Sequence, residues 1–196
     1  MILYLVRHGV AEGAEGRCIG RTDAPLSEAG ASSIRRLASA WAHPPDRLIA
    51  SGLARAHSSA AVLADAWNLP VKTEPRLGEM DFGAWDGRTW AELEAADGAR
   101  LAEWMGAWVT VPAPGGESFG DVAARVRAWA DELPRGGSAA VVGHAGSIRA
   151  LLCTLLELPL DAAFRLRIDH GRVSAVRLGA HGCELLFLNA DHVPAD

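Results

Sequence analysis

The sequence predicts an α/β fold, a three-layer α/β/α sandwich whose mostly parallel central sheet ends in an antiparallel edge. One observation is the alternation of short apolar runs with amphipathic helical patterns, which favours right-handed crossovers and a parallel sheet. A second is a set of short β-type runs near the end of the chain, joined by turns that contain glycine. A third is a tryptophan-rich middle stretch without a strand pattern, which predicts a small helical insertion.

The first half of the chain carries the alternation of strands and helices. An apolar run over residues 3–6 predicts a buried strand, and a loop rich in glycine and charge follows it. Ser27 suits the N-cap of the next helix, which the prolines at 44 and 45 stop. We expect a second strand over 47–51, a helix with Ala56, Ala60, Leu63 and Trp67 on its buried face, and a short strand over 71–73.

The second half contains the insertion and the sheet edge. Residues 79–116 hold four of the seven tryptophans, and we expect them to form a cap-like insertion of short helices over the sheet. Because no repeat or linker divides the chain, we expect a single domain over residues 1–196. The remaining elements are expected to be an amphipathic helix from Phe119, a strand over 138–142, an apolar helix from Ile148, and strands over 164–168, 173–178 and 184–188.

Composition limits the class of protein and its partners. The 196 residues carry a net charge of −5 with dispersed basic residues, so nucleic acid is not an expected partner. No apolar run is long enough to span a bilayer and no signal peptide begins the sequence, so no membrane association is expected. Three scattered cysteines, Cys18, Cys153 and Cys183, favour a reducing cytoplasm over a disulfide framework or a zinc site. The oligomeric state stays open, a homodimer included.

Three predicted strands end in residues that suit anion binding. The first ends at Arg7 and His8, the second is followed by Arg55 one helical turn into its helix, and the fourth by His144. In a parallel sheet these strand ends share one edge, where open α/β folds bind ligands. Guanidinium groups match phosphate oxygens, and the helix after His144 adds backbone N–H donors. The sequence therefore predicts a phosphate pocket built without a Walker loop.

Two histidines beside two arginines also predict a reaction. Nearby positive charge lowers the pKa of an imidazole, and a neutral imidazole is a competent nucleophile toward phosphorus. His8, at the strand end, is the better nucleophile candidate, and His144 then donates to the phosphoryl oxygens. Glu79 lies in an apolar, aromatic-flanked stretch that raises a carboxyl pKa, so it is the candidate acid for the leaving group. Asp81 competes for this role, and an exposed turn residue is the alternative interpretation of Glu79.

At this point the chain resembles the histidine phosphatase superfamily, which includes phosphoglycerate mutase-like enzymes. The resemblance covers most of the chain and rests on several short motifs in order. They are residues 5–9 (LVRHG), 20–27 (GRTDAPLS), 51–56 (SGLARA), 79–87 (EMDFGAWDG), 114–119 (PGGESF) and 142–146 (VGHAG).

The resemblance implies a metal-independent phosphomonoesterase without a cofactor, acting on a small phosphorylated metabolite. It implies that His8 becomes phosphorylated, that Arg7, Arg55 and His144 bind the phosphoryl group, and that Glu79 protonates the leaving oxygen and then activates water. Within the superfamily the motifs at 80–87 and 114–119 and the compact insertion most resemble α-ribazole-5′-phosphate phosphatases of cobalamin biosynthesis.

The chain departs from the family pattern just after Gly9. Many members have Glu-Thr there and an Asn three residues on, whereas this chain has Val10, Ala11 and Ala14. Arg17 and Arg21 are the candidates to supply substrate contacts in their place. We expect His57 on the surface. The remaining histidines show no clustering that suggests metal ligands: His43, His170, His181 and His192.

Three other functions compete with hydrolysis through a phosphohistidine. A serine hydrolase is excluded because Ala145 stands where a nucleophile elbow needs serine. A phosphoglycerate mutase-type phosphotransferase needs extra contacts to hold a bisphosphate, for which the short insertion offers little. A non-catalytic phospholigand-binding member is disfavoured because all five candidate catalytic residues are present: Arg7, His8, Arg55, Glu79 and His144.

Overall fold

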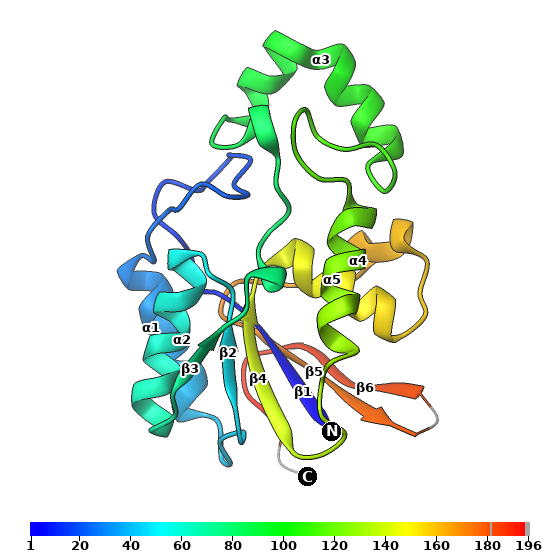
Figure 1. The fold of residues 1–196 in the computed structure, drawn as a ribbon. Coiled ribbons are helices and arrows are strands. Elements are labelled where there is room, and N and C mark those ends of the chain that lie inside the picture. Colours follow the sequence, from blue (N-terminus) through cyan, green and yellow to red (C-terminus); the bar gives the residue numbers. More distant parts are fainter. Residues whose placement is uncertain (181, 195–196) are drawn as a thin grey trace.

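In a computed structural model, which describes residues 1–180 and 182–194, one six-stranded sheet forms the centre of the molecule (Figure 1). The strand order is β3-β2-β4-β1-β5-β6, with β3, β2, β4 and β1 parallel and β5 and β6 antiparallel. The predicted α/β class, with its antiparallel edge, is therefore confirmed. The strands are β1 (Ile2–Arg7), β2 (Leu48–Ala50), β3 (Val71–Thr73), β4 (Ser138–Gly143), β5 (Val173–Gly179) and β6 (Gly182–Ala190).

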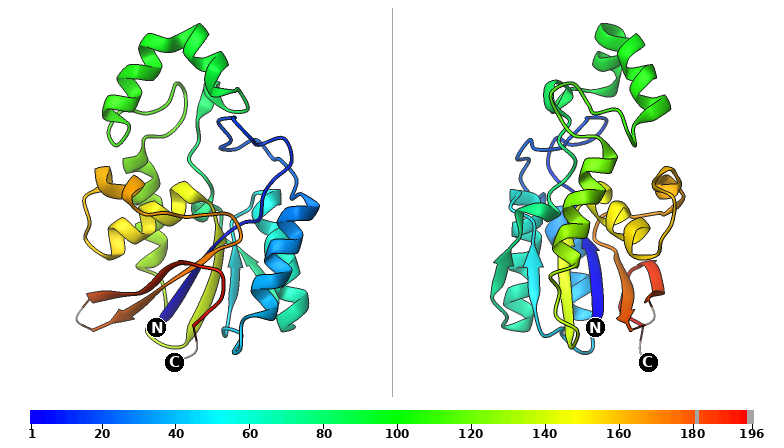
Figure 2. Two further views of the ribbon diagram at one scale, coloured as in Figure 1. Left: turned by 180° about the vertical axis from the view of Figure 1, so that it is seen from behind. Right: turned by 45° about the vertical axis from the view of Figure 1, so that its right-hand side comes forward.

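Alternation along β4 explains the three layers. Ala139 and Val141 belong to one hydrophobic core, which the helices α4 (Phe119–Ala130) and α5 (Ala145–Leu155) cover. Ala140 and Val142 face the opposite core, which α1 (Glu28–Ser39) and α2 (Ala54–Trp67) cover. Successive side chains of a strand point to opposite faces, so an all-apolar strand must be covered twice. Figure 2 shows the two helical layers on either side of the sheet.

The register of the central strands sets the position of the site. In the parallel pair β1–β4, Arg7 lies opposite Gly143, and the His8 amide donates to the Gly143 carbonyl at 3.0 Å. The loop after β1 and the helix after β4 therefore leave the same edge of the sheet. Ser27 caps α1 as predicted, because its hydroxyl accepts from the Gly30 amide.

One predicted strand is wrong. Residues 164–168 alternate apolar and basic side chains like an edge strand, but the 3₁₀ helix η3 (Leu160–Arg165) ends within this segment, and residues 166–168 form no strand. Local turns begin at Pro159, whose carbonyl accepts from the Ala162 amide. Further along, arginine side chains rather than a neighbouring strand donate to the backbone carbonyls. Arg149 Nε donates to the Leu166 carbonyl at 3.0 Å, and Arg7 Nη1 donates to the Ile168 carbonyl at 2.7 Å.

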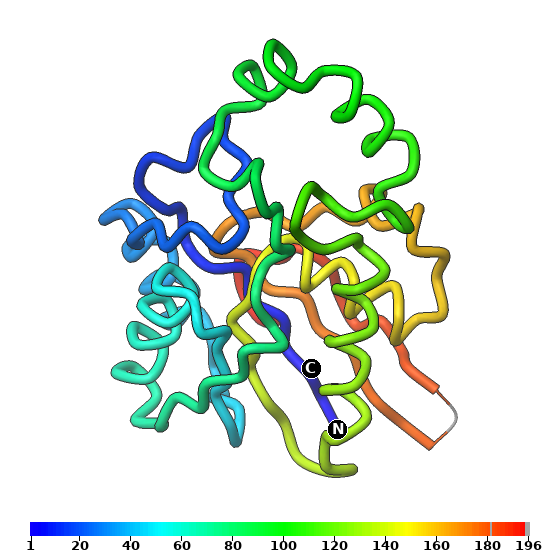
Figure 3. Tube along the Cα trace, turned by 45° about the horizontal axis from the view of Figure 1, so that its top comes forward, coloured from blue at the N-terminus to red at the C-terminus, as the bar shows by residue number. Residues whose placement is uncertain are grey.

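Residues 79–116, hereafter the cap, rise beyond the strand ends and carry the longest helix (Figures 1 and 3). A one-turn 3₁₀ helix η1 (Pro75–Leu77) precedes the cap, which holds η2 (Gly83–Trp85) and α3 (Trp90–Ala107). At Asp97 the backbone of α3 leaves helical geometry, with φ −144° and ψ 31°. The Asp97 carboxylate accepts from the Trp85 indole N–H at 3.0 Å, which ties the bend to the cap core.

The two ends of the cap are joined backbone to backbone, and we call this joint the stalk. The Ala84 amide donates to the Pro114 carbonyl at 2.9 Å, and the Glu117 amide to the Asp81 carbonyl at 2.8 Å. A Cβ on Gly83, whose φ is +53°, would lie 2.2 Å from the Pro114 carbonyl oxygen. Only glycine therefore lets the two chains approach this closely. Within the described ranges, no helix is both long and apolar enough to cross a membrane.

Candidate active site

A cleft of about 660 Å³ opens at the sheet edge predicted to bind an anion. Arg7 and His8 from the end of β1, Arg55 from α2 and Glu79 from the base of the cap all line it. The loop after β1 forms the opposite wall, with Val10, Ala11, Gly13, Ala14, Glu15, Arg17 and Ile19. Residues far apart in the sequence thus meet at one place, because the parallel strands end together.

His8 is held in one tautomer. Its Nδ1 lies 2.6 Å from the carbonyl oxygen of Gly9, which can only accept, so Nδ1 carries the proton and Nε2 the lone pair. Burial lowers the pKa of His8 well below its usual value, and the positive charges of Arg55 and Arg7 act in the same direction. The ring is therefore neutral near pH 7, with a nucleophilic Nε2.

His144 lies beside His8 but is fully buried. The two ring centroids are 5.0 Å apart, and His144 Nε2 lies 2.6 Å from the Ser51 hydroxyl. The pKa of His144 is also well below its usual value, first because of burial and then because of His8 and the arginines. Its Nδ1 has no hydrogen-bond partner among the described residues. A buried polar atom of this kind is costly, so an oxygen acceptor reaching it would be bound favourably.

Carbonyl oxygens fix the two arginines. Arg7 is anchored by its bond to the Ile168 carbonyl, and Arg55 Nη1 and Nη2 donate to the Thr22 and Gly20 carbonyls at 2.9 and 2.8 Å. Arg55 is only 2% exposed. Burial lowers the pKa of both guanidinium groups from its usual value, while the Glu79 carboxylate opposes that shift, so both remain cationic at neutral pH.

Glu79 is half-buried rather than an exposed turn residue. One carboxylate oxygen accepts from the Gly146 amide at 3.1 Å, at the start of α5, and the other from the Met80 amide at 2.9 Å. Arg125 on α4 holds the backbone behind it, donating to the Glu79 carbonyl at 3.0 Å. The competitor Asp81 instead accepts from the Gly83 amide in the stalk and does not line the cleft.

The two loop arginines have different positions. Arg17 lines the cleft, although its Nη1 donates to the Gly87 carbonyl at 2.8 Å. Arg21 does not line the cleft and lies 3.9 Å from the Asp81 carboxylate and 4.0 Å from that of Glu117. His57 is exposed, as expected from the sequence.

His170 lies in the cleft, a position that the sequence did not suggest. Its ring centroid is 5.2 Å from that of His8 in an edge-on contact, and it lies in the turn that leads into β5. The adjacent Gly171 amide donates to the Arg7 carbonyl at 3.1 Å, which fixes this approach. Burial and Arg7 lower the pKa of His170 to about 4. His181 lies outside the described residues.

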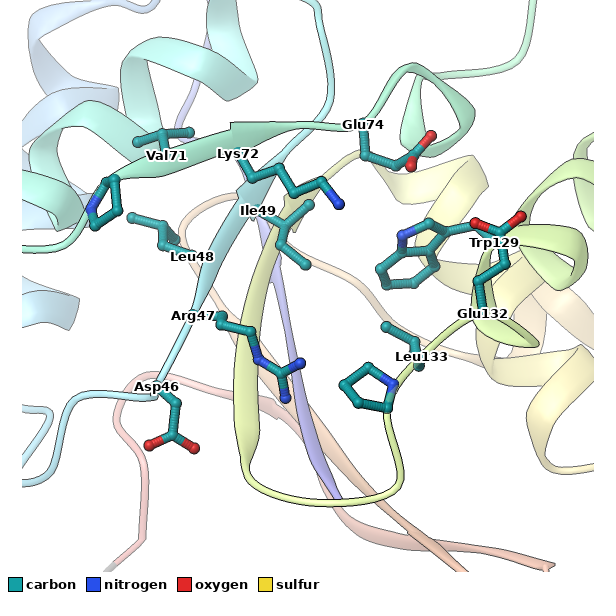
Figure 4. Close-up of a pocket in the computed structure, with 12 residues that line it drawn as sticks. Asp46, Arg47, Leu48, Ile49, Val71, Lys72, Glu74, Trp129, Glu132 and Leu133 are labelled. Atoms are coloured by element: carbon teal, nitrogen blue, oxygen red, sulfur yellow. The ribbon is translucent and has the colours of Figure 1, made fainter.

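A separate hollow of about 290 Å³ lies between β2, β3 and the end of α4 (Figure 4). None of the predicted site residues lines it. Two of its carboxylates, Glu74 and Glu132, are already paired with the Arg76 guanidinium. Its charges are therefore balanced internally, and it does not suit an anionic substrate.

The fold and the cleft together place Arg7, His8 and Arg55 at one sheet edge of an α/β sandwich. The model of the histidine phosphatase superfamily (branch 1) matches residues 3–191, so the chain belongs to this superfamily. Among its relatives is the adenosylcobalamin/α-ribazole phosphatase of Salmonella typhimurium, 30% identical over 195 residues, which are 97% of this chain and 96% of that protein. A probable phosphoglycerate mutase of Yersinia pestis is 32% identical over 179 residues, 89% and 83% of the two chains.

Solved structures agree with this assignment. The α-ribazole phosphatase of Shigella flexneri superposes with a TM-score of 0.92 at 26% identity, covering all of both chains. A mycobacterial glucosyl-3-phosphoglycerate phosphatase reaches a TM-score of 0.87 at 30% identity, covering 96% of this chain and 98% of the other. Similar chains thus carry names that differ in substrate while sharing the fold.

Proposed function

We propose that this protein is a phosphomonoesterase that works through a phosphohistidine on His8 and needs no metal ion. The observation that carries the proposal is the bond from His8 Nδ1 to the Gly9 carbonyl. It leaves the lone pair on Nε2, in a neutral ring close to the positive charges of Arg55, which is buried, and Arg7, which is half-buried. Phosphoryl transfer needs such positioning and the neutralisation of charge on the phosphoryl oxygens.

Two transfers complete the proposed reaction. His8 Nε2 attacks phosphorus, the bond to the ester oxygen breaks, and the Glu79 carboxyl group gives that oxygen its proton. Water then attacks the phosphohistidine, Glu79 takes a proton from it, the N–P bond breaks and inorganic phosphate leaves. Arg7 and Arg55 neutralise the phosphoryl oxygens in both steps. His144 donates from Nδ1 to a phosphoryl oxygen. This role is supported because Nδ1 has no hydrogen-bond partner among the described residues.

For the natural substrate we propose α-ribazole 5′-phosphate, which the names of similar proteins favour. Arg17 is the proposed contact for the part of the substrate beyond the phosphate, because it lines the cleft. Arg21 has a weaker claim to substrate contact, since two carboxylates surround it away from the cleft. A cytoplasmic location suits the free thiols of Cys18, Cys153 and Cys183.

The test is to trap the intermediate. The protein is mixed with a phosphate monoester in EDTA, quenched in alkali, which preserves phosphohistidine, and digested for mass spectrometry. We expect phosphate on the peptide that contains His8, and His8→Ala should lower kcat by at least about 10³-fold. His57→Ala, a surface histidine, is the matched control. Undiminished turnover of His8→Ala would exclude the mechanism, and phosphate passed to a phosphoglycerate instead of to water would identify a mutase.

A further inference from the structure

A second cavity shares Glu79 with the cleft, and we call it the aromatic chamber. Its volume is about 470 Å³, in the range of small-molecule sites. The cap provides one side of it, and α5 and η3 provide the other. Figures 1 and 2 show α3 standing over these two elements. Its wall includes the large side chains of Phe82, Trp90, Trp104, Met105, Trp108 and Phe164.

The chamber borders the cleft at Glu79. Glu79 lines both cavities, and Gly146, whose amide holds the Glu79 carboxylate, forms part of the chamber floor. Apart from Glu79, the only charged side chain in the lining is Arg149. Arg149 also stands over the Phe164 ring, 5.2 Å from its centroid. A guanidinium in this position can stack on a further ring.

The chamber leaves large apolar side chains open to water. Met105 is 64% exposed and Phe164 67% exposed, and Trp90 also counts among the exposed large hydrophobic residues. The rings meet edge to face, with Trp108 and Phe164 4.9 Å apart between centroids. Aromatic edges and faces that already enclose a cavity favour a flat apolar occupant over a sugar or a second anion.

The proposed acid, Glu79, relates the leaving group to this chamber. In an in-line displacement the leaving oxygen lies opposite the attacking nitrogen, here His8 Nε2. That oxygen must also lie within reach of Glu79, which separates the cleft from the chamber. The group attached to that oxygen therefore begins next to Glu79, the residue that lines both the cleft and the chamber.

We infer that the aromatic chamber binds a planar apolar ring system in the alcohol part of the substrate. This inference rests on the proposed function, because it takes the direction of the leaving group from the roles of His8 and Glu79. It names the substrate class as phosphate monoesters of alcohols that carry a flat, fused or substituted aromatic ring.

The test compares two alkyl phosphates that both need a protonated leaving group, 2-naphthylmethyl phosphate and ethyl phosphate. We expect the wild type to prefer the naphthyl ester by at least about 30-fold in kcat/KM, which corresponds to about 2 kcal/mol. Met105→Glu and Phe164→Ala should each reduce that preference about 10-fold, mainly through KM, while kcat/KM for ethyl phosphate stays within about twofold. Both side chains are exposed, so folding is retained. Leu185→Glu changes a 40% exposed leucine on β6, outside the chamber, and should alter neither substrate.

A binding measurement separates this inference from the proposed function. Binding of 2-naphthylmethanol is followed by quenching of tryptophan fluorescence in the wild type and in His8→Ala. Saturable binding that Met105→Glu weakens about 10-fold supports the chamber even if no ester is hydrolysed. An unchanged naphthyl preference in Met105→Glu and Phe164→Ala overturns the inference. It is equally overturned if sedimentation shows a dimer that Met105→Glu dissociates while naphthylmethanol does not bind.

Discussion

Replacing Gly146 with alanine should displace the proposed acid without disturbing the fold. Gly146 lies in the first turn of α5, and its amide donates to one oxygen of the Glu79 carboxylate. A Cβ at this position would lie 2.1 Å from the other carboxylate oxygen. Because the obstructed atom is the end of a flexible side chain, the carboxylate moves and the backbone stays.

The size of the effect follows from that distance. An ordinary contact requires 3.4 Å or more, so the oxygen must retreat by more than 1 Å. A misplacement of about 1 Å costs about 10²-fold in rate, or about 2.7 kcal/mol of transition-state free energy. Alanine in place of glycine within a helix stabilises by roughly 0.5–1 kcal/mol, so we expect an unchanged or slightly raised Tm.

The assay compares ethyl phosphate with 4-nitrophenyl phosphate, whose leaving group departs without a proton. Gly146→Ala should lower kcat/KM for ethyl phosphate about 10²-fold and for the nitrophenyl ester less than 10-fold. Gly98→Ala in α3 is the matched control, because nothing lies within 4 Å of its added Cβ. Equal losses on both substrates, or no loss at all, would refute the role assigned to Glu79.

Two further predictions concern stability. The pKa values of His8, His144 and His170 are lowered in the folded protein, so below pH 6.5 the unfolded chain takes up protons that the native state refuses. The free energy of unfolding should therefore fall between pH 6.5 and 5 by up to about 1.4 kcal/mol per pH unit for each buried imidazole, and urea midpoints that stay constant over this range would contradict it. Ser51→Ala removes the hydroxyl beside His144 Nε2 and should cost about 1–3 kcal/mol in urea unfolding, because it leaves that nitrogen buried without its partner; a midpoint equal to that of the wild type would count against the bond.

Much of the fold was predictable because its signals are local. The apolar run of β1 ends at Arg7, Ser27 caps α1, and Gly143 ends β4, so each boundary could be placed from neighbouring residues. The error at residues 164–168 has a non-local cause. Alternation there imitates a strand, but the Leu166 and Ile168 carbonyls are bonded by arginine side chains from elsewhere in the chain.

The site divides in the same way. Arg7, His8, Arg55 and Glu79 could be expected to meet because parallel strands end at one edge. His170 could not, since its approach to His8 depends on the antiparallel pairing of β5 with β1. The aromatic chamber was also beyond sequence reasoning, because its walls come from the cap, α5 and η3. Its tryptophans are visible in the sequence, but tryptophans grouped in the sequence are as consistent with a packed core of the cap as with a ligand cavity.

The stalk has a consequence for how this protein can change. Its hydrogen bonds join residues 81–84 to residues 114–117, close to Glu79 in the chain. The cap is therefore attached through two paired backbone segments rather than through a hinge. Changes in α3, which lies beyond the stalk, would leave the positions of Arg7, His8 and Arg55 unchanged. The cap thus behaves as an exchangeable module: replacing α3 between the two halves of the stalk would redirect the choice of alcohol while the His8 chemistry continues unchanged.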